Sequence, residues 1–173
     1  MEYPFVESPN VTRASGRSID VVVIHTMEIS ERADAAEICA RWFQSPVSEV
    51  SAHYCVDADS VVQCVREKDV AWHARGGNTN SIGVELAGFA SQTTRDWRDS
   101  YSAAVLERAA ALVAGDLVAG RRGLTGHVEV SRAFGKSDHW DPGDGFPVES
   151  FVDRVRVLQQ AQRRAARRRR ARA

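Results

Sequence analysis

The residues of this 173-residue chain best suited to chemistry are its five histidines and the carboxylates near them. The segment KSDHWDPGDGFP, residues 136–147, places His139 and Asp141 two positions apart, directly before a Pro-Gly turn signal. Side chains two apart in an extended segment lie on the same face, so this pair can address one common site. An imidazole and a carboxylate in that arrangement can ligate a metal ion or move a proton.

Two more histidines follow short apolar segments. SIDVVVIH, residues 18–25, is typical of a buried strand that ends at His25, and the short segment GLTGH ends at His127. Together with Asp141, these two imidazoles make up the ligand set of an open catalytic zinc site, whose fourth position is left to water. Taken singly, each histidine is more often a packed or surface residue. The segment that holds Asp141 could also be a solvated turn, although Pro142 and Gly143 favour a fixed geometry there.

The elements that must position these residues alternate between strands and helices. Besides 18–25, strands are expected at 80–89, at 123–127 and, as a hairpin turning at 57–60, within 51–65. The hairpin places His53 and Tyr54 on opposite faces. Glu85 lies in the apolar middle of its strand, an expensive position for a carboxylate, although a strand glutamate can also pair with a base at a sheet edge.

Helices are expected where apolar residues recur with helical spacing. The stripe Ala35, Ile38, Cys39, Trp42 and Phe43 predicts the first helix, with Asp34 and Glu37 as a capping box and Pro46 at its end. The second helix spans 100–118, and Pro147 is expected at the first position of a third helix, which continues to about 158. Alternating strands and helices indicate an α/β fold, with a mixed central β-sheet flanked by helices.

The composition indicates one domain and a distinct tail. We expect the domain to span residues 1–160 and the arginine-rich segment 161–173 to be disordered. That tail has seven arginines and no acid, so the body carries a net charge of about −7 and the tail about +7. Cys39, Cys55 and Cys64 lack CxxC spacing and are expected to be buried free thiols. No run of 18 apolar residues occurs.

Five blocks of the sequence resemble one known family. VVVIHTM, SAHYCVD, AWHARGGNTNSIGVELAG, LTGH and HWDPG occur in the order and at the separations of the type 2 zinc N-acetylmuramoyl-L-alanine amidases, relatives of phage lysozyme-like amidases and of peptidoglycan recognition proteins. The resemblance covers about residues 18–158, and SIGVELAG and HWDPG are its most specific blocks. It implies a single amidase-type domain that hydrolyses the amide between N-acetylmuramic acid and L-alanine of peptidoglycan.

The resemblance also implies a role for each residue of the site. His25, His127 and Asp141 correspond to the ligands of a Zn²⁺ cofactor, and Glu85 to the catalytic carboxylate. His139 stands where many members of the family have a lysine, and it would face the oxyanion that forms from the substrate.

The implied substrate groove involves a further set of residues. His73 and Asn80 fall where the family lines its peptide groove, and Trp72 and Trp140 offer apolar faces, although Trp72 is equally well explained as a core residue. We expect His53 or Tyr54 to border the site without binding metal. The implied partner is peptidoglycan or a muropeptide, bound by a monomer.

Two other functions compete with hydrolysis. A peptidoglycan recognition protein would keep the fold and lose a ligand, whereas all three ligand candidates and Glu85 are present here. The tail could contact anionic wall polymers, lipid headgroups or nucleic acid, and the acidic body makes nucleic acid the least expected of these. The N-terminus has no signal-peptide pattern, so we expect a cytoplasmic protein released to the wall, as an endolysin is, or a secreted protein whose leader is missing.

Overall fold

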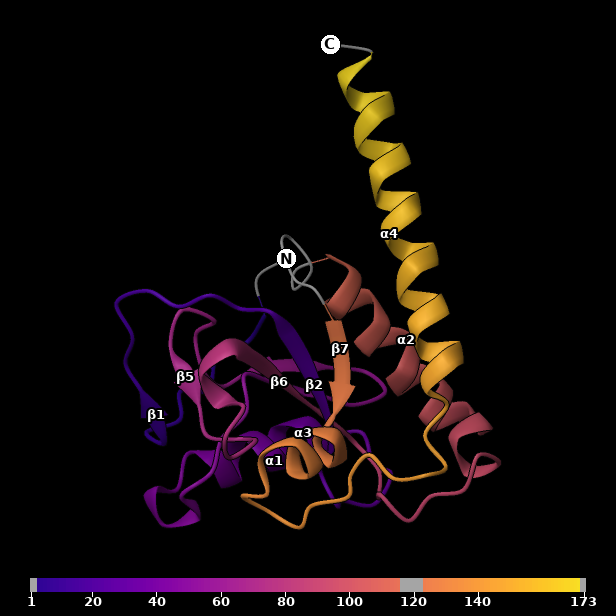
Figure 1. Cartoon of the computed structure of the whole chain (residues 1–173). Coiled ribbons are helices and arrows are strands. Elements are labelled where there is room, and N and C mark those ends of the chain that lie inside the picture. The colour runs from indigo at the N-terminus through magenta and orange to yellow at the C-terminus, as the bar shows by residue number, and fades with distance from the viewer. Residues whose placement is uncertain (1–2, 116–122, 172–173) are drawn as a thin grey trace.

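A computed structural model describes residues 3–115 and 123–171, and a mixed sheet of five strands lies at its centre (Figure 1). In spatial order the strands are β4 (Val61–Gln63), β3 (Tyr54–Val56), β6 (Ser81–Leu86), β2 (Val21–Thr26) and β7 (Gly123–Gly126). β3 and β4 form the predicted antiparallel hairpin, and the other neighbouring strands are parallel. The predicted α/β class with a mixed sheet is therefore confirmed.

Short elements connect these strands, and the sequence analysis did not predict them. β1 (Val11–Thr12) pairs with β5 (Val70–Ala71) in a separate two-stranded sheet. Single turns of 3₁₀ helix occur at Pro46–Ser48, Asn78–Asn80 and Asp96–Arg98. Segments of two or three residues are too short to show a hydrophobic period, so no sequence pattern predicts them.

Alternation along the strands gives the sheet two different faces. Val22 and Ile24 of β2 point into the main apolar core, and Val23 and His25 point to the opposite face. β2 and β6 are parallel, and His25 is paired in register with Glu85. Residues paired in this way share a face, so the strand register alone brings His25 and Glu85 side by side.

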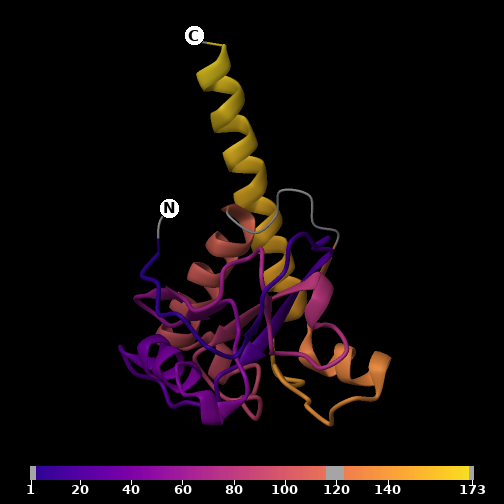
Figure 2. The same cartoon turned by 90° about the vertical axis from the view of Figure 1, so that its left-hand side faces the viewer.

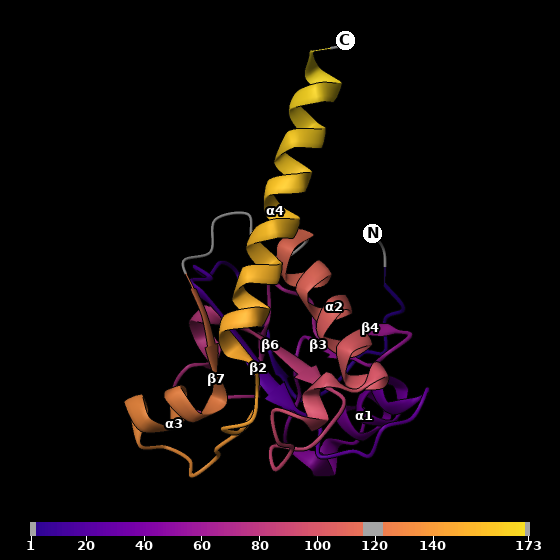
Figure 3. The ribbon, with the colours of Figure 1, turned by 90° about the vertical axis from the view of Figure 1, so that its right-hand side faces the viewer.

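Two helices cover the apolar face of the sheet (Figure 3). They are α2 (Ser100–Gly115) and α4 (Val148–Arg170), which lie against each other and bury Val105 and Leu112 of α2 and Phe151 of α4. Part of the predicted stripe of α2, at Leu117, lies outside the described residues. Pro147 precedes α4 as its N-cap rather than occupying the first helical position.

α1 (Ala35–Phe43) packs on the other face, over β3 and β4, but its predicted capping box is wrong. Asp34 stands at the N-cap without a side-chain cap hydrogen bond. Instead, Oδ2 of the buried Asp57, in the hairpin turn, accepts a hydrogen bond from the amide of Ala36 at 2.9 Å. The predicted stripe is also displaced, since Trp42 is 58% exposed while Ala36 is buried.

The predicted strand ending at His127 is one residue too long. β7 ends at Gly126, and His127 is the first residue of α3 (His127–Phe134), a helix that the sequence analysis did not predict. The amide of Gly126 donates to a carboxylate oxygen of Glu129 at 2.9 Å, which stabilises the start of this helix. Eight residues with a mixed polar pattern give too little amphipathic signal for α3 to be recognised.

The arginine-rich tail is helical over the residues described. α4 continues as helix to Arg170 and extends well beyond the rest of the molecule in two perpendicular views (Figures 1 and 2). Alanine, arginine and glutamine are strong helix formers, so a helix already nucleated on the body can propagate through them. The expectation of disorder considered charge alone and gave no weight to this propensity.

The remaining predictions about composition can be compared directly with the structure. Cys39, Cys55 and Cys64 are buried free thiols, as predicted. Among the described residues, no helix has both the length and the apolar character needed to cross a membrane.

Candidate active site

Three predicted ligand residues meet at the carboxyl-terminal edge of the sheet. His25 is near the end of β2, and His127 directly follows β7, the strand that runs parallel beside β2. Asp141 returns to the same edge from the loop after α3, where its carbonyl accepts a hydrogen bond from the amide of Val128 at 3.0 Å. Parallel strands end at the same edge, which explains why residues so distant in sequence converge.

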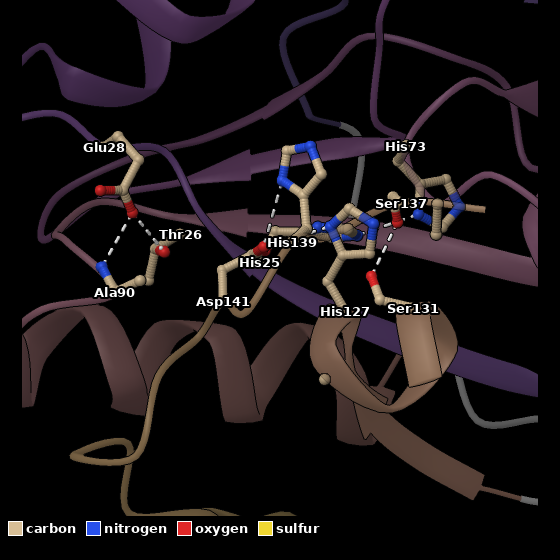
Figure 4. A network of polar contacts seen from close by, with 12 residues as sticks. His25, Thr26, Glu28, His73, Ala90, His127, Ser131, Ser137, His139 and Asp141 are labelled. Carbon is tan, nitrogen blue, oxygen red and sulfur yellow. Dashed lines mark hydrogen bonds and ion pairs between the residues drawn. The ribbon is translucent and has the colours of Figure 1, made fainter. Parts of the chain in front are cut away.

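The three side chains face one another at short range (Figure 4). Nδ1 of His25 lies 3.0 Å from Oδ2 of Asp141, and Nδ1 of His127 lies 3.1 Å from Oδ1 of the same carboxylate. One ligand atom from each residue falls within 4.8 Å of the others, and all three residues are buried.

This arrangement fits a divalent cation with nitrogen and oxygen ligands. Two Nδ1 atoms converge on a single carboxylate, and each neutral imidazole can present a lone pair there by carrying its proton on Nε2. Two histidines and one carboxylate leave a position open in a tetrahedral site, which is typical of catalytic zinc. The donor set of these described residues therefore suits zinc.

Electrostatics keep the carboxylate of Asp141 ionised. Burial alone would raise its pKa, but the hydrogen bonds with His127 and His25 outweigh that effect and hold the pKa well below its usual range. Burial lowers the pKa of His25, an effect that Asp141 partly offsets. A neutral imidazole beside an ionised carboxylate is the state that binds a cation.

Glu85 is the second carboxylate of the site. It lines the same cavity as the three ligand residues and is half-buried in β6. Burial, followed by the negative charges of Asp141 and Glu28, raises its pKa well above the ordinary glutamate value. A carboxyl group poised in this way can take up a proton during a reaction and release it again.

His139 lies at the rim of the cavity. Its ring stacks on that of His127, with 4.5 Å between centroids and 15° between planes, and its side chain is 62% exposed. Its Nδ1 is 3.6 Å from Oδ1 of Asp141, too far for a direct hydrogen bond. The ring is therefore held by stacking and remains accessible to a bound substrate.

The cavity around these residues has a volume of about 310 Å³. Trp72 and Trp140, both predicted to contact substrate, lie on its lining and are substantially exposed. The residues that line it are His25, Thr26, Glu28, Phe43, Val50, Ser51, Trp72, His73, Ala90, Glu85, His127, His139, Trp140 and Asp141. Ionisable groups gather near the three ligand candidates, while aromatic and aliphatic side chains form much of the remaining wall.

The structure places His73 differently from the expectation. It borders the cavity, but its Nδ1 lies 3.0 Å from Nε2 of His25 and its Nε2 lies 3.1 Å from the hydroxyl of Ser81 (Figure 4 shows His73 beside His25). Both ring nitrogens thus have protein partners. His73 supports a ligand residue from behind rather than presenting a free edge to the groove.

Three other predicted groove residues lie away from the cavity. His53 is fully buried, and its Nδ1 accepts a hydrogen bond from the amide of Gly83 at 3.0 Å. Tyr54 points into the main core, and its hydroxyl donates to Glu67 at 2.9 Å. Asn80 does not line the cavity; it is Asn78 whose side-chain oxygen accepts from the amide of His73. Whether these side chains reach the cavity depends on the local geometry of the strand or turn. The sequence blocks shared with the family do not resolve that geometry.

Glu28 is a cavity residue that the sequence analysis missed. Its Oε1 accepts hydrogen bonds from the hydroxyl of Thr26 at 2.7 Å and from the amide of Ala90 at 2.8 Å (Figure 4). Its backbone has φ of 53°, an uncommon conformation for glutamate. The feature of the sequence that could have indicated Glu28 is its position, three residues after His25 and just beyond the end of the strand.

Comparison with known proteins gives a consistent result. Residues 15–144 match the family model described as N-acetylmuramoyl-L-alanine amidase. The chain is 29% identical over 173 residues to N-acetylmuramoyl-L-alanine amidase A of Achromobacter lyticus, an alignment that covers 86% of this chain and 89% of that protein.

Solved structures share the fold. The hydrolase AmiA of Staphylococcus aureus, in complex with its ligand, superposes with a TM-score of 0.71 at 17% identity, covering 94% of this chain and 85% of that one. A structure of AmpD gives a TM-score of 0.66 at 24% identity, with 91% and 94% of the two chains covered. At these identities the superpositions are similarities of fold.

Proposed function

The chain belongs to the N-acetylmuramoyl-L-alanine amidase family, and on that premise we propose that it is a zinc-dependent hydrolase of the amide between N-acetylmuramic acid and L-alanine in peptidoglycan. The observation that supports this most strongly is the convergence of His25, His127 and Asp141 on one point beside Glu85. A binding protein has no need for a carboxylate with a raised pKa next to a metal site, whereas hydrolysis does.

The ligand residues would hold Zn²⁺ through Nδ1 of His25, Nδ1 of His127 and the carboxylate of Asp141. A zinc ion bound there would supply Lewis acidity, which lowers the pKa of water to about 7 and polarises a carbonyl. The protein's own contribution is to fix these donors on two adjacent strand ends and one loop, so that little rearrangement accompanies binding.

Glu85 would move the proton that hydrolysis requires. Facing the cavity from β6, its carboxylate accepts a proton from the attacking water and passes it to the nitrogen of the leaving L-alanine. Its raised pKa suits both halves of this transfer, because the group accepts readily and still donates to an amine. General acid–base catalysis of this kind contributes about 10²- to 10⁴-fold in rate.

His139 would stabilise the negative charge that develops on the carbonyl oxygen. Its exposed ring at the cavity rim can donate an N–H toward a substrate that occupies the cavity. The aromatic faces of Trp72 and Trp140 offer apolar contact surface to the sugar or the peptide.

The test uses purified peptidoglycan and the full-length protein. We expect release of new L-alanine amino termini, detected by mass spectrometry, with loss of activity on treatment with a chelator and recovery on addition of Zn²⁺. Glu85→Ala should abolish release while the protein still binds zinc. If peptidoglycan is bound but never cleaved, the protein is a recognition module and the proposed hydrolysis is wrong.

The biological setting proposed here is lysis or remodelling of the cell wall, as carried out by an endolysin. A zymogram against whole cell walls distinguishes this role from recycling of soluble fragments. A lytic enzyme clears intact wall, and a recycling enzyme acts only on released muropeptides.

A further inference from the structure

His73, Ser81 and Gly77 form a chain of hydrogen bonds that leads away from the ligand residue His25. Nδ1 of His73 lies 3.0 Å from Nε2 of His25, and Nε2 of His73 lies 3.1 Å from Oγ of Ser81. The hydroxyl of the fully buried Ser81 donates in turn to the carbonyl of Gly77 at 2.7 Å.

The carbonyl at the end of this chain fixes the direction of every bond in it. A carbonyl can only accept, so the single hydroxyl hydrogen of Ser81 is used there. The oxygen of Ser81 must then accept from Nε2–H of His73, which leaves Nδ1 of His73 without a hydrogen. That Nδ1 can only accept, and its one neighbour on this line is Nε2 of His25. This series of hydrogen bonds therefore favours a proton on Nε2 of His25.

The other side of His25 favours the opposite arrangement. Nδ1 of His25 lies 3.0 Å from a carboxylate oxygen of Asp141, which also can only accept. A neutral imidazole has one N–H and cannot satisfy both neighbours. A cation between Nδ1 and Asp141 removes the conflict, because the lone pair on Nδ1 and the negative oxygen then both face a positive charge.

We propose that His73 and Ser81 are positioning residues that hold His25 in its Nε2–H tautomer and so direct the lone pair of Nδ1 to the metal. This inference rests on the metal site of the proposed function and extends it. Groups that orient ligand histidines typically contribute about 10- to 100-fold to metal affinity.

The surroundings of His73 are shaped to hold its ring in this place. A Cβ at Gly83 of β6 would lie 2.5 Å from Cγ of His73, so the ring occupies space that any other residue at position 83 would fill. The main chain is fixed as well, because Oδ1 of Asn78 accepts from the amides of both His73 and Ala74, at 3.1 and 2.6 Å. Ring and backbone are thus held independently of any substrate.

The first test compares zinc affinity in full-length variants by competition with a chromophoric chelator. His73→Phe keeps a ring but has no acceptor, and we expect it to weaken zinc binding by about 10- to 100-fold. His73→Asn places an amide oxygen close to the position of Nδ1 and should restore most of that loss. Ser102→Ala, which removes a buried and hydrogen-bonded hydroxyl remote from the cavity, should leave the affinity unchanged.

The second test measures the tautomer itself in the metal-free protein. In the absence of metal, His73 and Asp141 compete for the one proton of His25. Long-range ¹H–¹⁵N spectra should therefore show a larger share of the Nδ1–H tautomer of His25 in Ser81→Ala than in the wild type. A purely structural role for His73 would leave this signature in place.

Three results would overturn the inference. They are equal zinc affinity of His73→Phe and wild type, no difference between His73→Phe and His73→Asn, and a tautomer ratio of His25 that Ser81→Ala leaves unchanged. A wild type that takes up no zinc overturns the metal site and this inference together. Zinc uptake without cleavage of peptidoglycan contradicts the proposed activity alone.

Discussion

Glu85 occupies a position that disfavours an ionised carboxylate and therefore costs stability, but that suits proton transfer. An apolar strand and the nearby charges of Asp141 and Glu28 disfavour its ionised form, so its pKa is raised. The folded state therefore binds a proton at Glu85 more tightly than the unfolded chain does. The stability that this residue contributes falls as the pH rises from its pKa in the unfolded chain to its higher pKa in the folded state.

The pH dependence of activity and stability should follow from that shift. Because the proposed base must be ionised, we expect activity to fall on acidification through the pKa of Glu85. Glu85→Gln should lose about 10²- to 10⁴-fold in kcat. In the metal-free protein it should melt no lower than wild type, with an advantage that grows from pH 4 to pH 7, as calorimetry can measure. The exposed Glu149→Gln serves as control, and a Glu85→Gln variant that melts lower at neutral pH would contradict this account.

His139 allows a test of charge stabilisation apart from metal binding. We expect His139→Ala to lower kcat by about 10²- to 10³-fold with an unchanged zinc content, because its nitrogen contacts no ligand atom at hydrogen-bond distance. His139→Lys keeps an N–H donor at the rim and should retain much of the activity. Loss of zinc together with activity in His139→Ala would instead assign the residue to holding Asp141.

Sequence and structure agree best on the ligand candidates and least on the groove. His25 and Asp141 could be found because five sequence blocks match one family in order, whereas the strand end and the turn are weak signals when taken alone. His53, Tyr54 and Asn80 could not be placed, because whether a side chain points to a cavity or to the core depends on a single-residue register. The part that His73 plays depends on a contact with His25, 48 residues away, which no local pattern encodes.

At the level of elements, Asp57 links the hairpin to α1. Its Oδ2 accepts from the amide of Ala36, and its Oδ1 accepts from the amides of Asp59 and Ser60 in the turn. We expect Asp57→Ala to lower the free energy of unfolding by about 2 kcal/mol, since a helix cap and a buried turn are lost together.

The matched control is Asp34→Ala, at the position that the sequence pattern suggested as the cap. Asp34 makes an exposed ion pair with Arg32 and no cap hydrogen bond, so its loss should lower the free energy of unfolding far less than the loss of Asp57 does. Denaturant unfolding of the two variants measures the difference. Equal effects would mean that Asp57 does not cap α1.

α2 was predictable because its apolar residues recur with a helical period over many positions, and β2 and β6 because each is a largely apolar run. α3 was not predicted, since its eight residues mix polar and apolar types, and the two-residue strands β1 and β5 are too short to show a pattern. The helical part of the tail was missed because arginine was read as charge and not also as a helix former.

On the scale of the whole molecule, charge is separated between the body and the projecting end of α4. We expect replacement of Arg163, Arg164 and Arg167–Arg170 by glutamine to weaken cosedimentation with anionic cell-wall material by about tenfold or more at low salt. The salt dependence of binding should flatten, while cleavage of soluble muropeptides stays unchanged. Glutamine preserves the helix, so circular dichroism provides the control. Equal cosedimentation at every salt concentration would show that the tail has no part in wall contact.

His25 and Asp141 are separated by 116 positions along the chain. During synthesis on the ribosome, the first ligand is therefore exposed long before the last has emerged. Until then a nascent chain would offer the proposed zinc site only part of its set of donors. Acquisition of the proposed metal would thus be a late event that ties the earliest strand of the central sheet to one of the last loops translated.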